Sequence, residues 1–293
     1  MKLPKVVLVS ILMVALLAGC SHSMRIQRRS DLMAYLYPDA SNPPAADPSG
    51  AVLQLPLRLG IAFVPGGSTQ ACRSCPDRRT MPAASEKALL DIVKKAFQDR
   101  DWVSQIVVIP SAYLRPGGGF DNLKAAARMH GVDVVALVSV DQLQSSNPSR
   151  LSFLYLTVVA AYTLPLDTHD TQTLIDAAVF HVPTNTFLLR APGVSTVKGH
   201  AAAVDLTRDL DARSATGFKL AMEDLAKNLD TEIEAFKSQI VSGERKDVDI
   251  MTREGVSIRD TDHPGGGGGS FSPLDALAVL ATLGFAVGWR RRG

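Results

Sequence analysis

The stretch from Val103 to Val140 decides the fold: VSQIVVIPSAYLRPGGGFDNLKAAARMHGVDVVALVSV. Val103–Ile109 predicts a strand that ends at Pro110, and Val132–Val140 is nearly all apolar, as expected for a strand buried on both faces of a sheet. Between them, Leu123–His130 predicts a helix that ends at Gly131, since glycine is common just beyond a helix C-terminus. A strand, a helix and a strand in this order predict a parallel pair joined by a right-handed crossover.

The sequence before this stretch has the same order of elements. Leu57–Val64 is an apolar run followed by Pro65-Gly66-Gly67, which predicts another buried strand that ends in a loop. Ser85 is a suitable N-cap for a helix whose apolar residues recur three and four positions apart. Three strands alternating with two helices therefore predict a βαβαβ unit with parallel strands.

After Val140 the connections between elements become short. Leu151–Leu164, Thr171–His181 and Thr186–Leu189 read as strands, and short links favour antiparallel neighbours. A long helix follows, with apolar residues three or four positions apart. These residues are Phe218, Met222, Leu225, Leu229, Ile233, Phe236 and Ile240. We interpret this row as core, with a coiled-coil partner face as the alternative. The predicted fold is α/β, a mixed-sheet α/β sandwich with βαβαβ followed by antiparallel strands and a long C-terminal helix.

The first twenty residues have the order of a secretory signal. Two lysines precede the apolar run Val6–Leu17, which at about twelve residues is too short to span a bilayer. The tetrad Leu17-Ala18-Gly19-Cys20 resembles the lipobox of bacterial lipoproteins. That resemblance implies that residues 1–19 are a signal peptide removed by lipoprotein-processing enzymes and that Cys20 is acylated. Because Ser21 rather than an aspartate follows, it also implies transfer to the outer membrane.

The end of the chain carries a second membrane signal. Gly265–Gly269 precede Phe271–Trp289, which as a helix would span about 28 Å, and three arginines follow. A run of glycines disfavours a helix, so the backbone before the span is accessible to a protease. This order of glycines, span and basic cluster resembles the GlyGly-CTERM sorting signal. Together with the lipobox it resembles the rhombotarget lipoprotein family.

The family resemblance implies that the tail is cleaved by rhombosortase, an intramembrane serine protease of the rhomboid family. The expected cleavage region is Gly265, Gly266, Gly267, Gly268, Gly269 and Ser270. A physical argument agrees, because a carrier that lifts a lipoprotein by its acyl chains would bring the apolar surface of a retained span into water. We therefore expect an inner-membrane intermediate and then a lipid anchor in the outer membrane, on its periplasmic or surface side. The alternative is a plain C-terminal anchor.

Residues outside the two signals divide the chain further. Prolines among polar residues predict a lipidated tether over 20–50, within which Asp31–Tyr37 could form a short helical or docking piece. The α/β domain is expected over 51–241, a polar spacer over 242–264 and the sorting tail over 265–293. The net charge of +2 belongs to the signals, since residues before Cys20 carry +2, residues after Gly269 carry +2, and the rest carry −2. The charge gives no reason to expect nucleic-acid binding.

Two cysteines remain besides Cys20. Cys72 and Cys75 form a Cys-x-x-Cys pair, which in an oxidising periplasm predicts a disulfide that closes a small loop. A redox-active pair is a second interpretation, although Cys72 lies some thirteen residues before the next predicted helix rather than at its first turn. A metal site is the third, and it would need two more ligands from elsewhere.

The sequence contains no recognisable catalytic constellation. Gly117-Gly118-Gly119 lies between a strand and a helix, but Asn122 stands where the third glycine of a dinucleotide fingerprint would fall. We therefore expect no enzyme activity, no cofactor and no bound metal, and a domain that binds an unidentified envelope protein or acts as an assembly subunit. One alternative is a regulatory activator of a periplasmic cell-wall enzyme, since the element order broadly resembles lipoprotein activators of penicillin-binding proteins and curli-channel lipoproteins. The other is a thiol oxidoreductase that uses Cys72 and Cys75.

Overall fold

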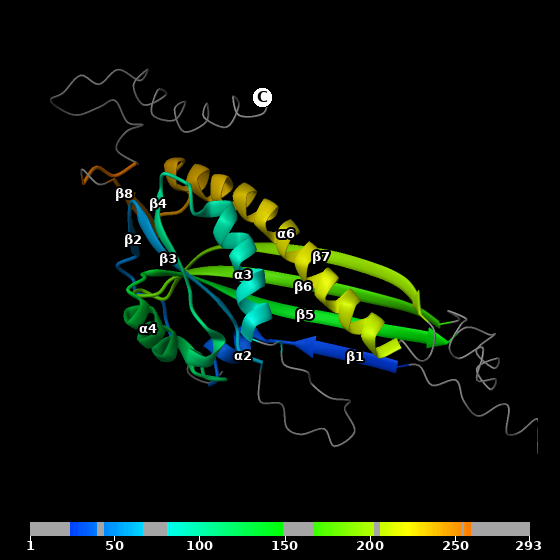
Figure 1. Cartoon of the computed structure of the whole chain (residues 1–293). Helices are drawn as coiled ribbons and strands as arrows, with labels where there is room; N and C mark the ends of the chain where they lie inside the picture. The colour runs from blue at the N-terminus through cyan, green and yellow to red at the C-terminus, as the bar shows by residue number, and fades with distance from the viewer. Residues whose placement is uncertain are drawn as a thin grey trace, which may run out of the picture.

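The computed structural model confirms the predicted fold class (Figure 1). It describes residues 24–39, 44–66, 81, 83–148, 167–201, 206–252 and 255–258. The strands are β1 (Met24–Arg29), β2 (Ala51–Gln54), β3 (Leu57–Phe63), β4 (Val103–Val108), β5 (Val134–Pro148), β6 (Asp167–His181), β7 (Thr186–Ala201) and β8 (Val248–Met251). The helices are α2 (Leu32–Leu36), α3 (Ala83–Phe97), α4 (Gly119–His130) and α6 (Leu206–Val241), with a 3₁₀ turn, η1, over Ser111–Tyr113.

The main sheet combines a parallel part with an antiparallel part. Its order is β4-β3-β5-β6-β7, with β3 parallel to both β4 and β5, and with β5, β6 and β7 antiparallel in succession. This confirms the three predicted parallel strands and the change to antiparallel neighbours. The predicted strand Leu151–Leu164 lies outside the described residues. The strand predicted over Thr186–Leu189 is much longer, because β7 continues to Ala201.

Helices cover both faces of the sheet (Figure 1). One core lies under α3 and α6, where Ile61 and Phe63 of β3 are buried with Leu90 and Met222. The alternate residues of β3 point to the opposite face, so that Ala62 is buried in a second core with α2 and α4. The row of apolar residues in the long helix therefore packs in the core, as the sequence indicated.

Two regions that the sequence marked as unpacked contain strands. The expected tether over 20–50 is wrong for Met24–Arg29, because this segment pairs antiparallel with β5 over Asp141–Ser146. The expected spacer over 242–264 is wrong for β8, which pairs in parallel with β2 to form a small second sheet. β1 is rich in arginine and β8 has only four residues, so neither segment carries a clear strand pattern of its own and the pairing partners fix both as strands.

Strand β5 is the centre of the architecture, because it is long enough to pair twice along one edge. Its first half pairs with β3 over Val134–Val138, and its second half pairs with β1. Helix α6 follows the antiparallel part of the sheet over 36 residues, a length of about 54 Å. None of the helices within the described ranges is both long enough and apolar enough to cross a bilayer. The predicted span Phe271–Trp289 lies outside these ranges.

Candidate functional site

The residues predicted to be acylated, to form a disulfide or to be cleaved all lie outside the ranges that the structure describes. Cys20, the pair Cys72 and Cys75, and the region Gly265–Ser270 all belong to this group. Disulfide, redox and metal interpretations of the cysteine pair therefore remain predictions, as do acylation and tail cleavage. Among the described residues, no group of three or more histidine, cysteine, aspartate or glutamate side chains is placed to hold a metal ion.

The glycine loop before α4 is closed by a neighbouring side chain. Asn122 accepts a hydrogen bond from the Arg115 amide at 2.7 Å and donates to the Tyr113 carbonyl at 3.2 Å. A Cβ on Gly118 would lie 2.5 Å from the Asn122 side-chain oxygen. Asn122, which stands where the fingerprint would have its third glycine, thus folds back over the loop. Its hydrogen bonds to Tyr113 and Arg115 account for the conformation of the loop.

His181 has the surroundings of a structural histidine. It ends β6, it is buried, and its Nδ1 atom lies 2.7 Å from the Thr184 hydroxyl. Burial lowers the pKa of His181 below its ordinary value of 6.5, while the nearby Asp133 carboxylate opposes that shift. The neutral ring is therefore favoured.

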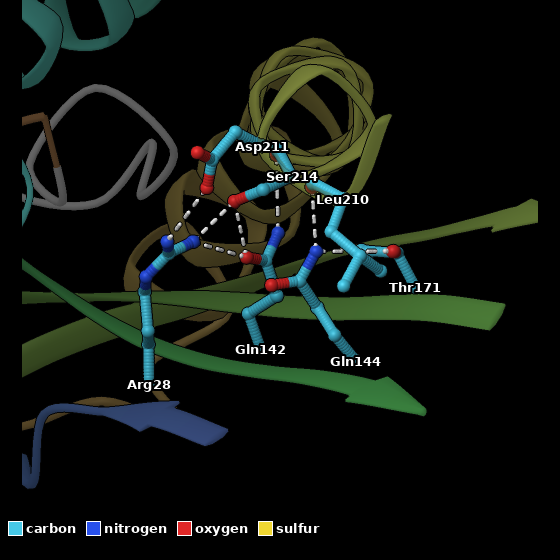
Figure 2. Close-up of polar contacts among 7 residues, drawn as sticks. All are labelled: Arg28, Gln142, Gln144, Thr171, Leu210, Asp211 and Ser214. Atoms are coloured by element: carbon cyan, nitrogen blue, oxygen red, sulfur yellow. Dashed lines mark hydrogen bonds and ion pairs between the residues drawn. The ribbon is translucent and has the colours of Figure 1, made fainter. Parts of the chain in front are cut away.

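A polar layer joins the antiparallel sheet to the first half of α6 (Figure 2). A row of four polar residues crosses the sheet here, each opposite the next: Arg28 in β1, Gln142 in β5, Thr173 in β6 and Ser195 in β7. Gln142 is fully buried, and its side-chain oxygen accepts from Arg28 Nη1 at 2.9 Å and from Ser214 Oγ at 2.6 Å. Its amide nitrogen donates to Thr173 Oγ1 at 2.9 Å and to the Ser214 carbonyl at 3.1 Å.

Arg28 and Gln144 complete this layer at its two sides (Figure 2). The Arg28 guanidinium also donates to the Ser214 hydroxyl and lies 3.9 Å from the Asp211 carboxylate. The Gln144 amide donates to the Leu210 carbonyl of α6 at 2.7 Å. These bonds satisfy buried polar groups and attach β1, the first strand of the chain, to α6. We interpret the layer as structural, because its hydrogen-bonding groups are directed at one another.

The outer edge of β7 is occupied by side chains from α6 and from the segment that follows it. Asn228 donates to the Pro192 carbonyl at 2.8 Å, and Asp224 accepts from the Val194 amide at 3.0 Å. Arg213 donates to the Lys198 carbonyl, and Arg245 donates to the Leu188 carbonyl, both at 2.8 Å. These bonds and the proline block much of a strand edge that could otherwise pair with a second chain.

A groove of about 560 Å³ lies on the sheet face opposite α6 and is the candidate functional site. Its floor is formed by β5, β6 and β7, and α2 with the end of β1 forms one wall. Apolar side chains on the floor remain exposed, including Leu174 at 42 % and Phe187 at 45 %. Phe187 continues the second core outward, since its ring lies 5.6 Å from that of the buried Phe180.

Charged residues surround the apolar floor of this groove. Arg190 and Asp176 form an ion pair at 2.5 Å, and Arg29 lies 3.6 Å from Asp31. An apolar floor with charges of both signs around it is typical of protein-binding surfaces. The sequence pointed to α2 as a docking piece, but the other walls come from strands far apart in the chain.

Comparisons with known proteins add little to this geometry. No protein-family model matches the chain, and no curated protein matches it by sequence. A homolog of a neuraminyllactose-binding hemagglutinin from Helicobacter pylori has 9 % identity and a TM-score of 0.34, over 71 % of this chain and 96 % of that one. Dodecameric PelC from Paraburkholderia phytofirmans, in two crystal forms, has 10 % identity and TM-scores of 0.25 and 0.24. These matches cover 68 % and 69 % of this chain and 97 % and 98 % of the PelC chains. Similarity of this extent does not bear on function.

Proposed function

We propose that this protein is a lipid-anchored envelope protein whose α/β domain binds another protein without catalysing a reaction. It is exported, acylated at Cys20, and cut within Gly265–Ser270 by a rhomboid-type sorting protease. The observation that carries the proposal is the presence of a lipobox and a three-part sorting tail on one chain. The groove beside α2 supplies a surface of suitable chemistry for the partner.

The position of β1 limits the alternative of a regulatory activator. On the predicted tether over 20–50, about thirty residues would have let such a domain reach an enzyme across the periplasm. Since β1 begins at Met24 and belongs to the main sheet, only three residues separate it from Cys20. A partner would therefore have to meet the domain close to the membrane that holds the lipid.

The mass of the protein purified from its native membrane tests the processing part of this proposal. We expect a polypeptide that begins at an acylated Cys20 and ends within Gly265–Ser270, because both signals are then used. A Cys20→Ala variant serves as the control and should lack the acyl mass. A native product that retains Phe271–Gly293 would contradict tail cleavage, and an unacylated mature Cys20 would contradict the lipid anchor.

Site-specific photocrosslinking in cells tests the binding part. A photoreactive residue in place of Leu174 lies on the floor of the groove, so we expect it to yield a discrete adduct with one protein. The matched control is the same replacement at Leu220, which is 43 % exposed on α6, on the other side of the sheet. Equal adducts at both positions, or none at Leu174, would show that the groove is not the binding surface.

A further inference from the structure

Four strands meet at one end of the antiparallel sheet (Figure 1). Met24, the first residue of β1, lies opposite Ser146 near the end of β5. Asp167, the first residue of β6, lies opposite both Pro148 of β5 and Ala201 of β7. The start of β1, the end of β5, the start of β6 and the end of β7 therefore form a single structural end, which we name the ribbon end.

The ribbon end is tied closely to the position of the predicted lipid. Met24 is four residues beyond Cys20, so their Cα atoms are at most about 14 Å apart even when the chain is fully extended. The acyl chains of Cys20 would lie in the bilayer, with Cys20 itself at the bilayer surface. The ribbon end must therefore remain within that short distance of the lipid surface.

The sequence that joins β5 to β6 favours the same orientation. Since Pro148 and Asp167 lie opposite each other, the connection between them begins and ends at the ribbon end. Its sequence over 151–166, LSFLYLTVVAAYTLPL, contains no charged residue and includes two tyrosines and a phenylalanine. Uncharged sequence of this kind is favourable next to lipid, where charged side chains are costly.

From these observations we infer that the ribbon end faces the bilayer that holds Cys20 and that the strands of the sheet extend from this end away from the membrane. The inference rests on the proposed acylation. The opposite end of the sheet is then distant from the lipid. Trp102 marks it, because its carbonyl accepts a hydrogen bond from the Leu57 amide at the start of β3. The thirteen residues of β5 from Val134 to Ser146 separate the two ends by about 40 Å.

Fluorescence quenching by lipid-attached quenchers tests this orientation. The chain has two tryptophans, Trp102 and Trp289, so Trp289→Phe leaves Trp102 as a single reporter at the distant end. A second variant carries Trp289→Phe, Trp102→Phe and Lys198→Trp, which moves the reporter to an exposed position three residues before the end of β7. Both proteins are purified in acylated form and placed in phosphatidylcholine vesicles in which a fraction of the lipid carries a nitroxide on its headgroup.

We expect quenching of the Lys198→Trp reporter to be several-fold greater than quenching of Trp102. Equal quenching of both reporters, or greater quenching of Trp102, would overturn the orientation while leaving the lipoprotein proposal intact, because acylation is verified separately by mass. Absence of acylation would instead refute the proposed function on which the inference depends. Circular dichroism of both variants establishes that each retains the native fold, and a Thr196→Trp reporter on the same strand replaces Lys198→Trp if that variant is unfolded.

Discussion

Replacing Gly193 with alanine is expected to lower the free energy of unfolding by about 3 kcal/mol, near the upper end of the usual cost of overpacking. Gly193 lies in β7 directly beneath α6, and a Cβ there would come within 2.2 Å of the Ala221 carbonyl oxygen. The same Cβ would lie 2.7 Å from the Leu225 amide nitrogen. Both contacts are with helix backbone, so a side-chain rotation cannot relieve them and the helix would have to move away from the sheet. Urea denaturation followed by circular dichroism measures the change.

Gly66→Ala is the matched control for this variant. Apart from its neighbours in the chain, no atom of the described residues lies within 4 Å of the position of a Cβ on Gly66. Its effect on stability should be within about 0.5 kcal/mol, as for surface substitutions in general. If the two variants lost the same stability, the close approach of α6 to β7 would not be a feature that the fold requires.

Replacing Gln142 with leucine is expected to lower the free energy of unfolding by about 3 kcal/mol. The change nearly keeps the volume of the side chain but removes all of its hydrogen bonds in a buried position. Four hydrogen bonds are lost, and the Arg28 guanidinium loses its acceptor in the sheet. The partner groups remain buried with fewer bonds, and this desolvation dominates the loss of stability. Thermal and urea unfolding of the purified domain measure it, and faster hydrogen exchange in β1 should accompany it.

Gln172→Leu provides the comparison, since Gln172 is exposed on the neighbouring strand and points to the opposite face. It should leave the stability nearly unchanged. A Gln142→Leu protein as stable as this control would mean that the polar layer contributes no net stability and that the leucine side chain replaces it fully.

Sequence reasoning found the parts of the fold that follow from apolar periodicity. The first part of β5, Val134–Val138, is a continuous apolar run because helices cover both of its faces. The second half of α6 was found in the same way, from the row that begins at Phe218. The first half was missed because Ser214 and Gly217 face the sheet there, and small or polar residues give little apolar signal.

Strand β1 was missed for a related reason. Its sequence, MRIQRR, has three arginines and was assigned to a tether, although Arg28 is largely buried with hydrogen-bonding partners in β5 and α6. The groove could be predicted only at α2, where Asp31–Tyr37 was marked as a docking piece. Its floor depends on the register of three strands, and the positions of Leu174 and Phe187 relative to each other follow from that register rather than from local sequence.

The length of α6 has a consequence for the order of events during maturation. The helix begins beside the ribbon end, which would carry the proposed lipid, and ends near β8, after which the chain continues toward the predicted sorting tail (Figure 1). From Ile258 to the start of the span at Phe271, the chain can extend at most about 45 Å, which is less than the 54 Å or so of the helix. If both proposed attachments form, helix α6 would have to tilt toward the lipid plane. Cleavage of the tail would remove that constraint and allow the sheet to stand upright on the membrane. Proteolysis would then determine the orientation of the domain as well as the membrane in which it resides.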